Sequence, residues 1–216
     1  MNMDESRFFN WYWQEATQEE KQLHDKMYEY EPYFSDMVFA EGSASYELIK
    51  CKSKKMGSEE WLDDVLDLPD ELRYFDYNYC LTKIEEIQGA LGSYNSAEQI
   101  ICICPENANN DGTLLHEMIH LHEHVIDELP KYFHDVVFWV LYQDLKKRVS
   151  GLDDAITQHA HILNEWDIDM RGGSHDILFL LKSFDLDIKQ GYPLGTVFGY
   201  GACDDFRYLS YRAGTD

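Results

Sequence analysis

Four histidines and two glutamates lie within fourteen positions, in the stretch TLLHEMIHLHEHVI at residues 113–126. Inside this stretch, residues 116–120 form the pattern H-E-x-x-H. On a helix, two histidines four residues apart differ by about 40° and one turn, so both imidazoles can reach one Zn²⁺ at about 2.0–2.1 Å. Glu117 lies next to that face, where its carboxylate can accept a proton from a water that the metal activates. The pattern predicts a zinc hydrolase site with His116 and His120 as ligands and Glu117 as general base.

The two remaining histidines of this stretch have other expected roles. His122 falls on the apolar face of the helix, which predicts a buried structural residue. His124 would lie about 12 Å along the helix axis from His116, too far to bind the same ion, and is expected near the site or at the surface. The extended metzincin pattern requires glycine and histidine where this chain has Glu123 and Ile126, so that class is excluded.

A zinc peptidase site needs a third protein ligand and one open position. Three residues downstream are candidates. His134 lies in KYFHDVVFW, Glu165 lies in LNEWDID, and His175 lies in GGSHDILF at the expected start of a helix. Glu165 belongs to an N-E-x-x-x-D pattern that resembles the third-ligand helix of thermolysin-like gluzincins, in which Asp169 would orient His116. The residues alone leave the choice open.

The run GALGSYNSAEQIICICPENANNDGTLLHEMIH at 89–120 resembles the catalytic core of SprT-like zinc metalloproteases, the family that includes Spartan. The shared features are a Ser-Tyr turn after a small residue, a strand, and the motif L-L-H-E-M-I-H. The resemblance covers roughly residues 77–135, with a possible extension to 185. It implies a zincin-like fold, Zn²⁺ as cofactor and peptidase activity.

The resemblance also implies that the third ligand is the histidine of an H-G-x-x-F motif at the start of a later helix. Two places match as H-D-x-x-F, with aspartate where the family has glycine: His134 to Phe138, and His175 to Phe179. We take His175 as the first choice, His134 as the second and Glu165 as the third. The choice of His175 makes residues 131–170 a two-helix insertion.

The pattern of apolar and turn-forming residues predicts an α+β fold, with a small antiparallel sheet packed on the active-site helix and additional helices at both ends. Residues 1–70 are expected to form an N-terminal helical segment packed on the core, with a capping box at Thr17–Glu20. Residues 71–216 are expected to form the zincin-like core, and its last strand is Gln99–Cys104. Further helices are expected over residues 131–149, 152–166 and 175–185.

The composition limits the partners. The chain has 41 acidic against 18 basic residues and a net charge of −23, which disfavours binding to nucleic acid. Five cysteines without a C-x-x-C pair argue against a zinc ribbon and a disulfide framework. No signal peptide and no apolar stretch near the ~20 residues of a membrane span are visible, so a cytoplasmic protein is expected.

Together these observations predict a zinc-dependent peptidase that hydrolyses protein or peptide substrates. We expect the substrate to add as a strand along the edge strand at 99–104. Tyr94, Tyr192 and Tyr200 are candidates for the donor that stabilises the oxyanion. Two alternatives remain: a gluzincin-type zinc hydrolase that uses Glu165, and a non-catalytic interaction protein that zinc stabilises.

Overall fold

The structure of the protein, a computed structural model, describes residues 5–56, 80–127, 131–165 and 175–212. These residues form an α+β fold, as predicted: helices dominate, and they accompany one sheet of three strands and one of two. No helix in this part of the chain combines the length and apolar character that a membrane crossing requires.

The N-terminal segment is helical in its described part. It consists of α1 (Glu5–Asn10), the π-helical turn η1 (Trp11–Glu15), α2 (Gln18–Tyr30), the 3₁₀-helix η2 (Glu31–Met37) and α3 (Ala44–Met56). The predicted capping box is confirmed, since the Thr17 hydroxyl accepts from Glu20 N–H and the Glu20 carboxylate accepts from Thr17 N–H. Helices α2, η2 and α3 contribute to the same hydrophobic cluster as the helices that carry the candidate site, whereas Phe8 of α1 and Trp11 of η1 pack in a second cluster with two strands of the three-stranded sheet.

The three-stranded sheet differs from the prediction in two ways. Its strands are β1 (Leu81–Ile84), β2 (Gly92–Asn95) and β3 (Ile100–Ile103), in the order β1-β3-β2. The pair β1–β3 is parallel and only β2–β3 is antiparallel, so the sheet is mixed. The predicted edge strand at 99–104 is therefore wrong: β3 is the central strand. Its four residues are all buried, which suits a strand that has a neighbour on each side.

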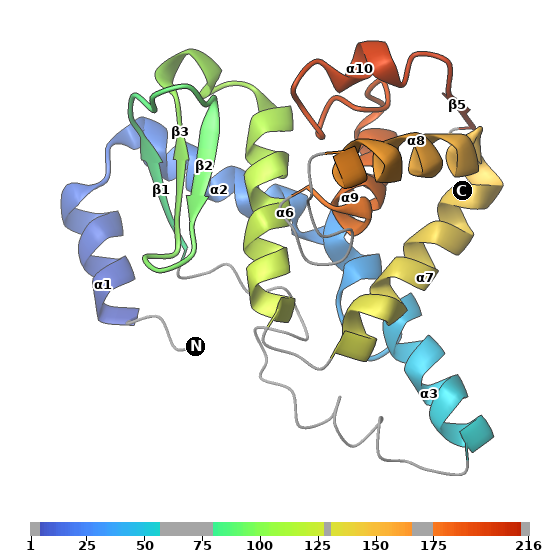
Figure 1. Ribbon diagram of the computed structural model, residues 1–216. Helices are drawn as coiled ribbons and strands as arrows, with labels where there is room; N and C mark the ends of the chain where they lie inside the picture. The colour runs from blue at the N-terminus through green and yellow to red at the C-terminus, as the bar shows by residue number, and fades with distance from the viewer. Residues whose placement is uncertain (1–4, 57–79, 128–130, 166–174, 213–216) are drawn as a thin grey trace.

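Helix α6 (Asp111–Asp127) carries the H-E-x-x-H pattern and follows the short 3₁₀-helix η3 (Pro105–Asn107). In Figure 1, α6 lies between the three-stranded sheet and the C-terminal helices, next to β2. Its apolar side chains Leu115, Met118 and Ile119 are fully buried in the main cluster. Since α6 is embedded on several sides, the positions of its histidines are fixed by packing rather than by the helix alone.

The C-terminal half is built from α7 (Lys131–Arg148), α8 (Leu152–Glu165), α9 (Ile177–Gln190) and α10 (Ala202–Asp205). The helices predicted over 131–149 and 152–166 are present as α7, which ends one residue early because Val149 belongs to a strand, and as α8, with residue 166 outside the described residues. The two-residue strands β4 (Val149–Ser150) and β5 (Ser210–Tyr211) pair with each other. Helix α9 begins two residues later than predicted because Asp176 is its N-cap, with a carboxylate that accepts from Phe179 N–H at 2.8 Å.

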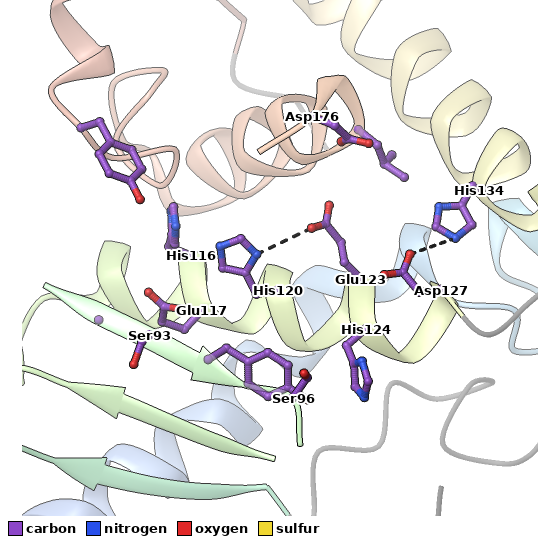
Figure 2. Close-up of a pocket in the computed structure, with 14 residues that line it drawn as sticks. Ser93, Ser96, His116, Glu117, His120, Glu123, His124, Asp127, His134 and Asp176 are labelled. Carbon is purple, nitrogen blue, oxygen red and sulfur yellow. Dashed lines mark ion pairs between the residues drawn. The ribbon is translucent and has the colours of Figure 1, made fainter. Parts of the chain in front are cut away.

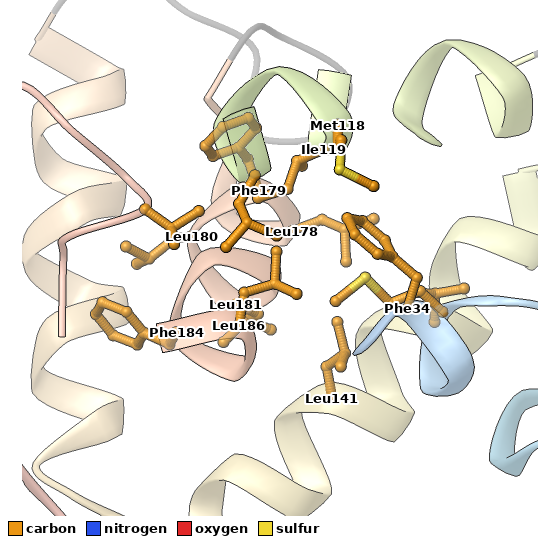
Figure 3. Close-up of a cluster of buried hydrophobic side chains, with 14 of the residues drawn as sticks. Phe34, Met118, Ile119, Leu141, Leu178, Phe179, Leu180, Leu181, Phe184 and Leu186 are labelled. Carbon is orange, nitrogen blue, oxygen red and sulfur yellow. The ribbon is translucent and has the colours of Figure 1, made fainter. Parts of the chain in front are cut away.

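Helix α9 is the centre of the core. All of its residues from 178 to 188 are buried, and Figure 3 shows its apolar side chains packed against Met118 and Ile119 of α6, Leu141 of α7 and Phe34 of η2. This packing holds the start of α9 against α6. His175 directly precedes Asp176, the N-cap of α9.

Candidate metal centre

Three histidine side chains from two separate segments converge. His116 and His120 lie one turn apart on α6, and His175 lies directly before the N-cap of α9. The Nε2 atom of His175 is 2.9 Å from Nε2 of His116 and 3.2 Å from Nε2 of His120. Each of the three offers a ring nitrogen within 4.8 Å of the others, and among the described residues they form the group that could hold a metal ion.

The orientation of His116 is fixed from the far side of its ring. Its Nδ1 lies 2.9 Å from the carbonyl oxygen of Val197, which can only accept, so the proton is on Nδ1 and Nε2 presents a lone pair. The loop that carries Val197 is itself held by α9. The buried Asp187 carboxylate accepts from Gly195 N–H at 2.7 Å and from Val197 N–H at 2.9 Å.

His175 is held by its backbone and by its neighbours. Its φ of +60° lies in the left-handed region, which is uncommon for a residue other than glycine. The His175 carbonyl oxygen accepts from Nε2 of His159 on α8 at 2.8 Å. The Phe179 ring lies against all three imidazoles, with centroid distances of 4.6 to 4.8 Å. A strained backbone that its surroundings hold in place is common at functional sites.

The surroundings keep two of these imidazoles neutral. Burial, together with the neighbouring His120, lowers the pKa of His116 to about 4. Burial and the neighbouring His116 and His120 lower the pKa of His175 to about 3. A neutral imidazole offers the nitrogen lone pair that a metal requires. Near neutral pH, these groups are therefore ready to bind a cation.

Glu117 lies beside the three histidines and is almost fully buried. Burial raises the pKa of its carboxyl to about 7, although the nearby His120 opposes that shift. The carboxyl fits its place because residue 92 of β2 is glycine. A Cβ atom on Gly92 would come within 2.8 Å of Glu117 Oε1 and 2.9 Å of Thr113 Cγ2. The structure thus places a group that can exchange protons near neutral pH next to the histidine cluster.

Two cavities meet at this cluster and form one cleft. The first, of about 400 Å³, extends along α6 past His120 and His124; the second, of about 460 Å³, lies under Leu91 and Val197. Figure 2 shows the first of them. Both cavities are lined by Gly92, His116, Glu117 and Tyr200. Residues 90–94 and Ser96, on and around β2, border the cleft, so an extended ligand could lie along β2 and pass the histidines.

The other candidates for a third ligand are not part of the cluster. His134 on α7 lines the far end of the first cavity, where its Nε2 donates to the carbonyl oxygen of Ile126 at 3.0 Å and lies 3.5 Å from Asp127. Helix α8 ends at Glu165, but the Glu165 side chain and Asp169 lie outside the described residues.

The remaining histidines of α6 lie apart from the cluster. His122 is buried and its Nε2 donates to the carbonyl oxygen of Met37 at 2.8 Å, which confirms the structural role predicted for it. His124 lines the first cavity with its ring centroid 6.0 Å from that of Tyr94.

Of the three tyrosines named from the sequence, Tyr200 lies at the cluster. Its ring centroid is 5.2 Å from that of His175 and 6.0 Å from that of His116, and the residue is 81% exposed. Tyr94 lines the first cavity with a buried hydroxyl, and Tyr192 lines neither cavity. Tyr200 has a φ of +54° between two glycines that also have positive φ, a backbone that holds the phenol over the cleft.

Sequence reasoning missed three residues that support the cluster. His159 is buried, and its Nε2 contacts the His175 carbonyl oxygen. Asp187 and Lys182 are fully buried on α9. The run ILFLLKSFDLDI indicates such residues, because it places a lysine and two aspartates within an otherwise apolar helix. Charged side chains are costly to bury unless they have partners.

Comparisons of the chain with protein-family models, with curated proteins and with solved structures gave no match. The function is therefore inferred from the geometry of the histidine cluster and its cleft.

Proposed function

We propose that the chain is a zinc-dependent peptidase with a zincin-like core, in which His116, His120 and His175 hold Zn²⁺ and Glu117 is the general base. One observation carries the proposal. Three imidazole Nε2 atoms from distant segments converge beside a buried carboxylate in a cleft. This combination of three nitrogen ligands, an adjacent base and access for substrate is typical of catalytic zinc sites.

The donor atoms fit zinc. Ligands at about 2.0–2.1 Å in a tetrahedral site lie about 3.3–3.4 Å from one another. The Nε2 distances of 2.9 and 3.2 Å from His175 to its two neighbours are close to this separation. Three protein ligands leave the fourth position for a water or for the substrate, as catalytic sites require.

The chemistry that zinc supplies when bound is polarisation of the scissile carbonyl and a lower pKa for the attacking water. Glu117 accepts a proton from that water while the water oxygen attacks the carbonyl carbon. The same carboxyl then donates the proton to the amine nitrogen as the C–N bond breaks. The carboxyl of Glu117 is buried beside the histidines, where it can both accept and donate this proton.

Tyr200 is the residue that we assign to stabilise the developing negative charge. Its phenol can donate a hydrogen bond, and its ring lies close to those of His116 and His175. A donor held in advance at the site of charge development lowers the barrier without further reorganisation. The two flanking glycines give the loop the conformation that this position needs.

The substrate is proposed to lie along β2 rather than β3. Strand β2 ends the three-stranded sheet of the described residues, and it borders both halves of the cleft. In an antiparallel pair, every second residue directs its N–H and C=O groups away from the partner strand. An extended peptide can pair with these groups and so carry its scissile bond past Glu117.

The variant Glu117→Gln separates a peptidase from an interaction protein that zinc only stabilises. A peptidase loses hydrolysis of an unfolded protein substrate, by on the order of 10²-fold or more, and keeps its zinc and its fold. Glu106→Gln is the matched control, since Glu106 lines the cleft on the side away from the first cavity. Zinc-loaded wild-type protein that cleaves no peptide bond would support the interaction protein instead.

A further inference from the structure

Lys182 is a lysine in the interior of α9, with an exposed fraction of 0%. Its neighbours Leu181 and Phe184 on the helix are equally buried and apolar. Removal of an ammonium group from water costs several kcal/mol, and only a well-placed counter-charge offsets this cost. A methionine or leucine would fill the position more cheaply, so this lysine calls for an explanation beyond packing.

The counter-charge is Glu123 of α6. One carboxylate oxygen of Glu123, Oε1, lies 3.5 Å from Lys182 Nζ, and the other, Oε2, lies 3.7 Å from Nδ1 of His120. The Glu123 side chain is only 16% exposed. Figure 2 shows its carboxylate on the same side of α6 as the His120 ring, and the dashed line marks the pair. One carboxylate thus faces the buried lysine and the candidate ligand at once.

This arrangement orients His120. A carboxylate beside Nδ1 favours the tautomer with the proton on Nδ1, which leaves the lone pair of Nε2 for a metal. The Nε2 atom of His120 is the one that faces His175. Glu123 thus lies beside Nδ1 of His120, at 3.7 Å, on the ring side that corresponds to the Val197 carbonyl at His116, which is closer at 2.9 Å. A carbonyl is fixed by the backbone, whereas a glutamate side chain needs another group to hold it.

We propose that Lys182 is a positioning residue of the metal centre: its ammonium fixes the Glu123 carboxylate, which in turn holds His120 with Nε2 directed at the metal. This role depends on the proposed zinc site. Lys182 acts through Glu123, its ion-pair partner, while the carboxylates of Asp176 and Asp127 also contribute negative charge around its ammonium. Carboxylates that hold a ligating histidine in this way typically change metal affinity by about 10- to 100-fold.

The test is the zinc affinity of purified protein, measured by competition with a chromogenic chelator. In Lys182→Met we expect the dissociation constant for zinc to rise by about 10- to 100-fold. Because this variant leaves Glu123 as an unpaired buried charge, it can fail to fold. The neutral pair Lys182→Met/Glu123→Gln lessens that problem, since it removes both charges of the ion pair and keeps an amide group beside His120 Nδ1.

The neutral pair is expected to unfold, without metal, within a few degrees of wild type and yet to bind zinc at least 10-fold more weakly. The control is Lys189→Met/Asp185→Asn, which neutralises another ion pair of α9, 2.7 Å long, and should leave zinc affinity unchanged. A folded neutral pair that binds zinc within twofold of wild type overturns the role of Lys182. Wild-type protein that binds no zinc overturns the metal site itself, so the two failures are distinguishable.

Discussion

The Nε2 atoms of His116 and His175 lie 2.9 Å apart, although 59 positions separate the two residues in the chain. His116 lies in the middle of α6, and His175 is the residue directly before the N-cap of α9. Two imidazole nitrogens at this distance repel each other unless a proton or a metal lies between them. The contact therefore links the folding of α9 onto α6 to the assembly of a ligand set.

Zinc content separates the candidates for the third ligand. His175→Ala removes one of three nitrogen ligands, and we expect it to reduce bound zinc well below one equivalent at micromolar zinc. His134→Ala should retain zinc, since His134 donates instead to the carbonyl of Ile126. Metal analysis of both purified variants, with thermal unfolding as a check on folding, decides the question. Full zinc in His175→Ala and loss in His134→Ala would reverse the assignment.

Gly92→Ala tests the fit between β2 and the proposed base. The added Cβ would approach within 2.8 Å of Glu117 Oε1, and the end of the glutamate side chain can move away. The fold should survive, but the carboxylate would be displaced, which can cost about 10²-fold in kcat. Steady-state kinetics at saturating zinc measure this effect. The control is Ser96→Ala, since Ser96 lies beyond the end of β2. If Gly92→Ala has the same kcat as Ser96→Ala, Glu117 does not act as the base from its place beside Gly92.

Tyr200→Phe tests the proposed oxyanion donor. The variant keeps the aromatic ring beside His175 and removes only the hydroxyl. We expect kcat to fall by about 10²-fold while KM and zinc content stay close to wild type. Tyr94→Phe removes a hydroxyl from the same cleft and should change kcat much less. Similar kinetics for Tyr200→Phe and wild type would remove Tyr200 from the mechanism.

His24 gives the protein a pH-dependent stability that is independent of the metal centre. Its ring packs against Phe8 and Trp11, and burial lowers its pKa to about 4, although Asp25 opposes the shift. Below pH ~6.5 the unfolded chain takes up a proton that the folded chain excludes, so the free energy of unfolding falls as pH drops toward 4. The loss is on the order of 3 kcal/mol.

His24→Phe is expected to remove this contribution while it preserves the ring contacts. Urea unfolding of both proteins at pH values between 7 and 4 gives the comparison. The difference in the free energy of unfolding between variant and wild type should grow in favour of the variant as the pH falls. Parallel curves over the whole range would show that His24 does not titrate in this way.

Local patterns predicted the local structure well. The capping box at Thr17 and Glu20 uses residues three apart, so the sequence alone specifies it. The spacing of His116 and His120 defines one face of α6 for the same reason, and the apolar face of that helix identified His122 as buried. In each case the residues that form the pattern lie within a few turns of one helix.

The features that sequence reasoning could not specify depend on contacts between distant segments. The strand 99–104 was expected at the sheet edge, but β1 pairs with it in parallel, and no local pattern reveals this neighbour. His134 and His175 share the same short motif, and only the packing of α9 on α6 distinguishes them. Lys182 and Asp187 act on groups that come from other elements.

The dependence of hydrolysis on zinc tests the central claim most directly. The protein is stripped of metal with a chelator, and cleavage of an unfolded protein substrate is then followed as zinc is added back. We expect no cleavage by the metal-free protein, and a rate that rises in proportion to zinc up to one equivalent per chain. A chain that binds one zinc and cleaves nothing, or one that cleaves equally well without metal, would contradict a zinc peptidase built on His116, His120 and His175.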